Sequence, residues 1–201
     1  MDKTERKPEL IVIAGPNGSG KTSVTTKFLH HEWADGTVYI NPDQVANEKF
    51  GDWNSLDAVL KAANYCEEWR EQCLKDKVSF VFETVFSAED KIDFLIRAKE
   101  AGFFIRLFFI STEHPSICAA RIAKRVMEGG HDVPIPKIIS RYTKSVENCE
   151  TVARLVDRLY VYDNSVNDQD ARLLFRLTNG LIAKRYSDVL PEWAKNIIPE
   201  Q

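Results

Sequence analysis

The stretch Gly15-Pro16-Asn17-Gly18-Ser19-Gly20-Lys21-Thr22 constrains this chain more than any other part of it. It has the spacing Gly-x-x-x-x-Gly-Lys-Thr, it follows an apolar run at residues 10–14, and residues 23–31 after it contain no glycine or proline. Glycines let consecutive backbone N–H groups converge on phosphate oxygens, and a helix N-terminus behind the loop favours negative charge. The order strand, glycine-rich loop, helix therefore predicts a nucleoside triphosphate site, and it disfavours a chance glycine-rich turn.

The side chains at the end of this loop have predicted roles of their own. Lys21 carries a point charge that can follow the β- and γ-phosphates, and the Thr22 hydroxyl can ligate Mg²⁺. Ser23, the next residue along the chain, completes the predicted nucleotide site.

The rest of the chain alternates between predicted strands and predicted helices. Apolar runs predict strands at residues 37–40, 78–82, 103–110 and 159–162, and helical spacing covers residues 43–50, 55–76, 88–101, 115–127 and 137–157. This alternation predicts an α/β fold of the P-loop NTPase type, with three layers and a mostly parallel sheet covered on both faces. The pair Asn179-Gly180 predicts a C-terminal β-hairpin, which either adds an antiparallel edge or lies over the nucleotide.

Composition narrows the classes of function. With 201 residues and 44% hydrophobic content the chain can bury one sizeable core, so we expect a single domain over 1–201 with a loose N-terminal segment, 1–9. A net charge of −3 argues against nucleic acid as a partner. No apolar run is long enough to cross a bilayer, which argues against a membrane. The four cysteines have no C-x-x-C or metal spacing, and no signal peptide is seen, so we expect reduced thiols in the cytoplasm.

Polar residues follow the other predicted strands at their carboxyl ends, namely Asp43, Glu83, Ser111-Thr112 and Asp163. Ligands of open α/β sheets bind outside these ends, so Asp43 and Glu83 should share one mouth with the phosphate loop. Phosphoryl transfer needs a carboxylate to orient or deprotonate the attacking hydroxyl, a role we assign to Asp43. The alternative for Asp43 is a helix N-cap. Glu83 directly follows apolar residues, where a carboxylate is costly unless it is paired or solvated at a site.

Arginines cluster in a predicted helical lid over residues 115–157. Arg121 and Arg125 are four residues apart and hence on one helix face, and Arg141 lies on the next helix. Closure of such a lid would bring guanidinium groups onto the γ-phosphate, where charge develops. The alternative is a solvated basic face. His131, in the loop between the two helices, is either a substrate contact or an ordinary polar loop residue.

Taken together, several segments resemble the zeta toxin family of phosphate-loop kinases. The similarity runs from about residue 10 to about residue 195 and is carried by residues 15–23, Asn41-Pro42-Asp43, Glu83-Thr84, residues 125–134, Arg141-Tyr142 and Asp163-Asn164-Ser165. The segment Gly129-Gly130-His131-Asp132-Val133-Pro134 between arginines is the most specific of these.

The resemblance implies an ATP-dependent kinase with Mg²⁺ and a small hydroxyl-bearing acceptor, which in the best-known zeta toxins is UDP-N-acetylglucosamine. By position, Lys21 and Thr22 would hold phosphates and Mg²⁺, and Asp43 would be the general base. Glu83, with Thr84 and His131, would face the acceptor. Arg121 or Arg125, together with Arg141, would clamp the transferred phosphoryl group. A small antitoxin protein would be the partner.

Two other functions stay open at this point. The first is a nucleotide-binding regulatory protein with little kinase activity. The second is a polynucleotide 5′-kinase, which would need a basic channel lined with aromatic residues. The four tryptophans are scattered along the chain rather than grouped with lysines, at Trp33, Trp53, Trp69 and Trp193. This distribution disfavours the second function.

Overall fold

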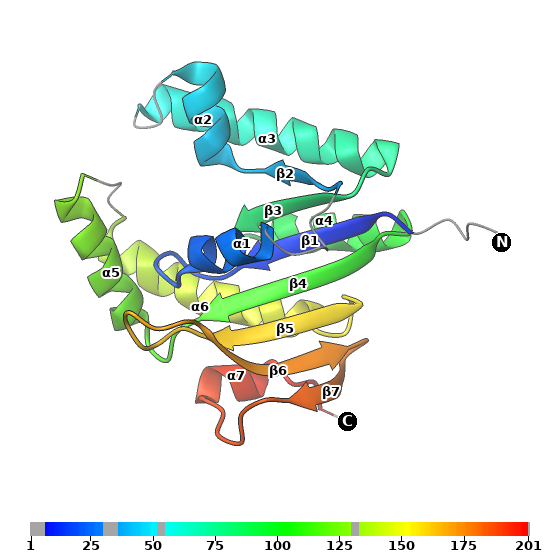
Figure 1. Cartoon of the computed structure of the whole chain (residues 1–201), viewed down its shortest axis with the longest axis vertical. Helices are drawn as coiled ribbons and strands as arrows, with labels where there is room; N and C mark the ends of the chain where they lie inside the picture. Colours follow the sequence, from blue (N-terminus) through cyan, green and yellow to red (C-terminus); the bar gives the residue numbers. More distant parts are fainter. Residues whose placement is uncertain (1–6, 30–35, 52–54, 130–132, 201) are drawn as a thin grey trace.

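A computed structural model describes residues 7–29, 36–51, 55–129 and 133–200 of the chain. Its centre is a seven-stranded sheet in the order β2-β3-β1-β4-β5-β6-β7 (Figure 1). The strands are β1 (Glu9–Ala14), β2 (Val38–Ile40), β3 (Phe80–Thr84), β4 (Phe104–Ser111), β5 (Arg158–Asp163), β6 (Arg172–Thr178) and β7 (Leu181–Arg185). The helices are α1 (Lys21–Leu29), α2 (Pro42–Phe50), α3 (Leu56–Asp76), α4 (Glu89–Glu100), α5 (Pro115–Met127), α6 (Ile135–Val152) and α7 (Glu192–Asn196).

The pairing of the strands confirms the predicted α/β fold. Strands β1 to β5 run parallel, and only the β5–β6 and β6–β7 pairs among the described residues are antiparallel. The hairpin turns at Asn179 and Gly180, which both have positive φ, as a tight two-residue turn requires. It extends the edge of the sheet, which decides between the two positions that the sequence left open. The parallel strands bring their carboxyl ends to one side, on the left of Figure 1.

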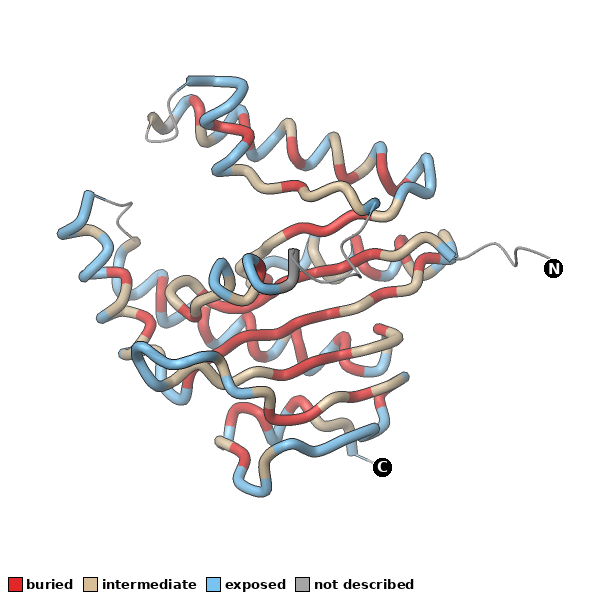
Figure 2. Tube along the Cα trace, in the orientation of Figure 1, coloured by how far each residue is buried: buried red, intermediate tan, exposed pale blue. Residues whose placement is uncertain are grey.

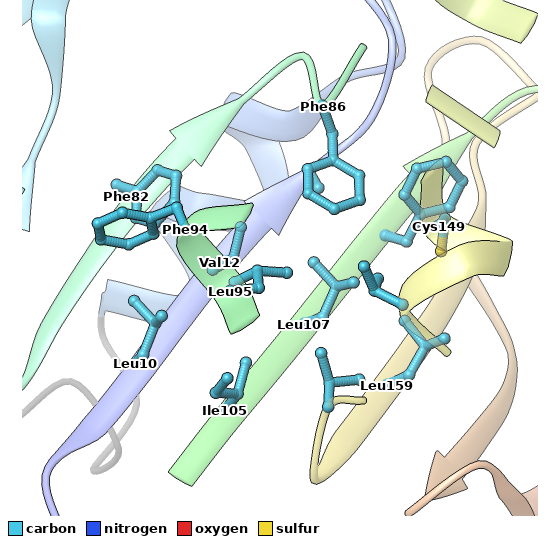
Figure 3. Close-up of a cluster of buried hydrophobic side chains, with 14 of the residues drawn as sticks. Leu10, Val12, Phe82, Phe86, Phe94, Leu95, Ile105, Leu107, Cys149 and Leu159 are labelled. Atoms are coloured by element: carbon cyan, nitrogen blue, oxygen red, sulfur yellow. The ribbon is translucent and has the colours of Figure 1, made fainter. Parts of the chain in front are cut away.

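Helices cover the two faces of this sheet unequally. One face carries the larger apolar core, in which α4 and α6 lie over β1, β4 and β5, as the labelled side chains of Figure 3 show. Phe94 and Leu95 come from α4 and Cys149 from α6. The other face carries a smaller cluster that includes Ile11, Ile13 and Tyr160, with α1 packed on it through Val24. Figure 2 shows the central strands buried along most of their length, while much of α1 is exposed.

Some element boundaries differ from those predicted. Helix α6 begins directly after Pro134, two residues earlier than expected, because a proline in the first turn costs no helical hydrogen bond, and it ends at Val152 instead of residue 157. The short helix α7 was not predicted. At the N-terminus Glu9 already belongs to β1, and its backbone N–H donates to Ser79 Oγ. Residue 9 is therefore part of the sheet.

All four cysteines are free and buried, and Cys66 and Cys73 face the core from α3. In the described part of the chain no helix combines the length and the apolar character that crossing a bilayer requires.

Candidate active site

The phosphate loop connects the end of β1 to the start of α1 and is held mainly by backbone groups. The Gly15 N–H donates to the Thr84 carbonyl at the end of β3, at 3.2 Å. Lys21 Nζ folds back and donates to the carbonyls of Gly15, at 2.9 Å, and Pro16, at 3.1 Å. The ammonium group of Lys21 therefore lies across the loop itself, where a phosphate can replace these carbonyls as its partner.

Two glycines of the loop are required by close packing. Gly15 has φ +149°, and a Cβ atom there would lie 1.9 Å from the Ile110 carbonyl oxygen of β4. Gly18 has φ +78°, and its Cβ would lie 2.6 Å from the Cys118 carbonyl oxygen of α5. Heavier residues at either place would push the loop away from β4 and α5. The spacing of the motif is thus a packing requirement as well as a phosphate-binding one.

The charges around Lys21 identify the neighbours of the loop. Burial lowers the pKa of Lys21 to about 8; the charge of Glu83 opposes this effect, while Arg125 and Arg141 add to it. Such effects fall off with distance, so one carboxylate and two guanidinium groups lie near enough to the lysine for their charges to act on it. The structure therefore brings together four of the residues that the sequence assigned to catalysis or to the acceptor.

The other loop residues have distinct positions. The Ser19 side chain is fully buried, and its hydroxyl has no hydrogen-bond partner among the described residues. The Ser19 carbonyl accepts a hydrogen bond from Asn164 Nδ2 at 2.8 Å. Thr22 and Ser23 are exposed in the first turn of α1, where their hydroxyls can meet a ligand. An exposed hydroxyl at Thr22 suits one position of a magnesium ion that is otherwise held by phosphate oxygens and water.

Asp43 and Glu83, the two carboxylates predicted at strand ends, are linked through Tyr39 and Asn41. The Tyr39 hydroxyl donates to Glu83 Oε1 at 2.8 Å and accepts from Asn41 Nδ2 at 2.7 Å. Asn41 Oδ1 in turn accepts from the backbone N–H of Asp43 at 2.8 Å. Asn41 is thus the N-cap of α2, and the sequence-based alternative that Asp43 is the cap is wrong. The exposed carboxylate of Asp43 is free of a capping role.

The three arginines of the predicted lid do not have the same neighbours. Arg141 Nη1 donates to Asn17 Oδ1 in the phosphate loop at 3.2 Å. Arg121 bridges two loops: its Nε donates to Asn167 Oδ1 at 2.9 Å and its Nη2 to the Val166 carbonyl at 3.4 Å, while its Nη1 donates to the Gly18 carbonyl of the phosphate loop at 3.5 Å. Arg121 therefore fastens both the β5–β6 loop and the phosphate loop to α5. Arg125 and Arg141 are the two arginines whose charges act on Lys21.

A cavity of about 620 Å³ opens between α5 and the β5–β6 loop, beside the phosphate loop. Among its lining residues are Gly20, Ser23, Arg121, Lys124, Arg125 and Asn164. Its volume is in the range of small-molecule sites. Because it reaches Gly20 and Ser23, a ligand in it can have its phosphates on the loop.

A second cavity, of about 480 Å³, lies on the other side of the β5–β6 loop, over β4 to β6. It also reaches Gly20 and Ser23, but its floor is apolar, with Phe108 and Tyr160 stacked at 4.7 Å between ring centroids. Fewer of the predicted site residues line it, because Arg121 and Arg125, which line the first cavity, are absent from its lining.

Several residues at strand ends are buried or are paired with other side chains and backbone groups of the protein. Ser111 and Thr112 are fully buried. Asp163 accepts from Ser165 Oγ, and its other oxygen accepts from Arg172 Nη2 at 3.3 Å. Thr84 Oγ1 accepts from the Phe86 N–H at 3.1 Å, which holds the turn after β3. His131 lies outside the described residues, so its predicted contact with the acceptor stays a prediction.

Sequence reasoning gave no role to Tyr39, Asn41 or Asn164. Asn164 follows directly after β5, so the rule that ligands bind at strand carboxyl ends could have found it. Asn164 also packs tightly against the phosphate loop: a Cβ added at Gly20 would lie 2.2 Å from Asn164 Nδ2. Tyr39 lies inside β2 and carries no motif, so its role depends on knowing that β2 and β3 are neighbours.

Comparison with known proteins identifies the family of this chain. The family model for zeta toxin matches residues 1–175. A protein of Haemophilus influenzae (strain ATCC 51907 / DSM 11121 / KW20 / Rd), described as uncharacterized, is 29% identical over 138 residues, which are 66% of this chain and 91% of that protein.

Two solved structures share the fold at low sequence identity. The crystal structure of AvrRxo1-ORF1:-ORF2 with ATP has a TM-score of 0.66 at 18% identity, covering 95% of this chain and 62% of that chain. The PezAT chromosomal toxin–antitoxin system of Streptococcus pneumoniae has a TM-score of 0.58 at 17% identity, covering 85% of this chain and 72% of that one. The chain thus spans less than two thirds of the matched AvrRxo1 chain. With a family model that covers most of its residues, this chain belongs to the zeta toxin family.

Proposed function

We propose that this protein is an ATP-dependent kinase that transfers the γ-phosphoryl group to a hydroxyl of a small acceptor. The observation that carries the proposal is a phosphate loop with Lys21 folded across it and Arg141 hydrogen-bonded to its Asn17, and with the charges of Glu83 and Arg125 acting on the same lysine. Cations at the phosphates and a carboxylate on the acceptor side are the parts that phosphoryl transfer needs. Sugar nucleotides such as UDP-N-acetylglucosamine are the first acceptors to test.

In the proposed reaction Asp43 accepts the proton of the acceptor hydroxyl. The hydroxyl oxygen forms a bond to the γ-phosphorus, and the bond from that phosphorus to the β–γ bridging oxygen breaks, releasing ADP. Lys21, Arg125 and Arg141 stabilise the negative charge that spreads over the transferred group. Glu83, half-buried on the same side, accepts a hydrogen bond from the acceptor and orients it.

The nucleoside of ATP occupies the cavity beside α5 in this proposal. Arg121 and Asn164, which line it, are held by hydrogen bonds to the β5–β6 loop and to the phosphate loop. A site held in this way loses little entropy on binding. Mg²⁺ fits the exposed Thr22 hydroxyl and supplies positive charge that neutralises the β- and γ-phosphates. Asn17 lies beside Arg141 and joins the phosphate site to the helical lid.

The test is phosphoryl transfer by wild-type protein and by the variant Asp43→Asn. The protein is incubated with ATP, Mg²⁺ and a panel of sugar nucleotides, and in parallel with a metabolite extract; new phosphorylated products are found by mass spectrometry. Loss of the base lowers transfer about 10²- to 10⁴-fold. ATP affinity, measured by calorimetry, stays within about twofold, because Asp43 contacts the acceptor and not the nucleotide.

Asp57→Asn is the matched control for this variant. Asp57 is the second residue of α3, and Asp43 is the second residue of α2. Neither aspartate caps its helix, because the side chain of Asn41 caps α2 and that of Ser55 caps α3. The control should transfer phosphate at the wild-type rate. ATP binding without any phosphorylated product in the wild type would instead favour a regulatory nucleotide-binding protein.

A neutralising partner protein belongs to the same proposal. The PezAT structure is described as a toxin–antitoxin system, and the common fold supports a similar arrangement for this chain. Expression of wild-type protein should arrest growth of a bacterial host, while Asp43→Asn should not. Co-expression of a small protein encoded beside this chain should restore growth; an arrest that persists in Asp43→Asn would separate toxicity from kinase activity.

A further inference from the structure

We infer that Tyr39 is a positioning residue, which fixes Glu83 and the first turn of α2 relative to each other and so aligns the acceptor with Asp43. This inference rests on the proposed function, since it concerns the acceptor side of the same site. It adds a residue that neither the motif of the phosphate loop nor its arginines point to.

The strand register places Tyr39 and Glu83 on one face of the sheet. Strands β2 and β3 run parallel, with Tyr39 opposite Val81 and Ile40 opposite Phe82. Side chains alternate along a strand, so Val81 and Glu83 point to the same face as Tyr39. Glu83 is therefore one step beyond Tyr39 towards the carboxyl ends of the strands. On its other side β3 pairs with β1, and there Glu83 lies opposite Ile13, which is two residues before the phosphate loop.

The Tyr39 hydroxyl uses both its donor and its acceptor capacity. It donates to Glu83 Oε1 at 2.8 Å and accepts from Asn41 Nδ2 at 2.7 Å. The other end of the Asn41 amide accepts from two backbone N–H groups of α2, those of Asp43 at 2.8 Å and Gln44 at 3.3 Å. One chain of hydrogen bonds therefore runs from β3 through β2 into α2.

The hydroxyl is well suited to this link. Burial raises the pKa of Tyr39 above its ordinary value, and the neighbouring charge of Glu83 raises it further. The group stays protonated over the whole physiological range and remains a donor to the carboxylate. The ring of Tyr39 packs against the apolar cluster of the same sheet face, which restricts where the hydroxyl can lie.

Position matters here because β2 is a short edge strand. It has three residues, and within the described part of the sheet it pairs only with β3. Backbone pairing over three residues leaves the start of α2 weakly determined, whereas a side-chain bond to Glu83 ties it to the centre of the sheet. Small errors in placing reacting groups are costly, since a displacement of about 1 Å can reduce the rate about 10²-fold.

The test compares Tyr39→Phe with the matched control Tyr65→Phe. Phenylalanine keeps the packed ring and removes the hydroxyl. Tyr65 lies on α3 with its ring against Trp69 at 5.9 Å between centroids, and no hydrogen bond of its hydroxyl is found among the described residues. Transfer from ATP is measured with UDP-N-acetylglucosamine as the acceptor probe, and with a metabolite extract as the second source of acceptors. Thermal unfolding confirms that both variants are folded.

Tyr39→Phe should lower kcat for transfer about tenfold and leave KM for ATP within about twofold, while Tyr65→Phe changes neither. The decisive measurement adds Glu83→Ala, which removes the acceptor of the Tyr39 hydroxyl, alone and combined with Tyr39→Phe. If Tyr39 acts through Glu83, the two effects are strongly non-additive, and Tyr39→Phe has less than about a twofold effect in the Glu83→Ala protein. A residue that merely stabilises the fold would act equally in both backgrounds.

The hydrogen bonds to the first turn of α2 can be tested separately by amide hydrogen exchange, without any phosphoryl acceptor. In Tyr39→Phe the amide protons of Asp43 and Gln44 should exchange with solvent several-fold faster than in Tyr65→Phe. Unchanged exchange, or additive kinetic effects in the presence of wild-type transfer, overturns the inference and leaves the proposed function intact. Wild-type protein that phosphorylates neither acceptor source overturns the proposed function first, and that result is seen without any variant.

Discussion

The phosphate loop and the acceptor side of this site are constructed from different parts of the polypeptide. The loop is held through its backbone groups. The Gly15 N–H donates to the Thr84 carbonyl, and the carbonyls of Gly15 and Pro16 accept hydrogen bonds from Lys21 Nζ. The acceptor side is held through side chains, in a chain of hydrogen bonds through Tyr39 and Asn41. The two sides meet at Glu83, whose charge acts on both Lys21 and Tyr39.

This difference has a consequence for substitutions. A backbone-built loop is sensitive to added volume, and its failure should weaken nucleotide binding. A side-chain link is sensitive to the loss of single polar atoms, and its failure should slow transfer with ATP still bound. The four variants and conditions below test this division, in order of decreasing effect.

Lys21→Ala removes the charge at the centre of the loop and should have the largest effect. Transfer should fall by at least about 10³-fold, because no other group replaces the ammonium on the β- and γ-phosphates. Product formation from ATP is followed by mass spectrometry, with Lys27→Ala on the exposed side of α1 as the control. Turnover retained in Lys21→Ala would contradict the assignment of the phosphate loop.

Gly15→Ala adds one methyl group where the Ile110 carbonyl oxygen lies 1.9 Å away, at a positive φ. The loop must shift to accommodate it, so ATP affinity should fall about 10²-fold in calorimetry. Gly102→Ala is the control, since Gly102 also has positive φ but nothing lies within 4 Å of its added Cβ. Equal losses of ATP affinity in both variants would show that backbone strain matters and that close packing does not.

The sequence made the two sides of the site unequally predictable. Gly15, Gly18 and Lys21 could be assigned because backbone-built phosphate loops leave a fixed spacing of residue types along the chain. Asp43 and Glu83 could be assigned from the rule on strand ends, which needs only the strand order along the sequence. The order of helices and strands was predicted for the same reason, since hydrophobic periodicity is a local property.

The remaining features depend on which segments are neighbours in space. The role of Tyr39 requires that β2 pair with β3, and the turn of Arg121 towards Asn167 requires the position of the β5–β6 loop. Neither the β2–β3 pairing nor the contact between Arg121 and Asn167 leaves a pattern in the local sequence. The sequence could therefore not separate Arg121 from Arg125, nor recognise that Asn41, two residues before Asp43, is the cap of α2.

Arg141→Ala tests a residue that contacts the phosphate loop but lies on α6, a helix packed on the core. Its guanidinium group lies on Asn17 and beside Lys21, where charge develops during transfer. We expect kcat to fall about 30-fold and ATP affinity to fall less than about threefold, because the interaction strengthens in the transition state. Lys144→Ala, one turn along α6 and exposed, should leave both quantities unchanged. A loss of ATP affinity without a loss of kcat would show that Arg141 acts with the phosphate loop in nucleotide binding.

The smallest expected effect is a dependence of ATP affinity on pH above about 8. The pKa of Lys21 is lowered to about 8 by burial, so the free protein carries a charged lysine below that pH and a neutral one above it. Binding of the triphosphate requires the charged form, and the affinity should therefore fall about fivefold between pH 8 and pH 9. Calorimetry over this range measures it, with Lys21→Arg as the control, because a guanidinium group stays protonated and should give a flat profile. The acceptor side supplies no group that would reproduce this slope, since burial and Glu83 keep the Tyr39 hydroxyl protonated there. A slope that persists in Lys21→Arg would assign the titration to a group outside the loop and remove the basis for separating the two sides by pH.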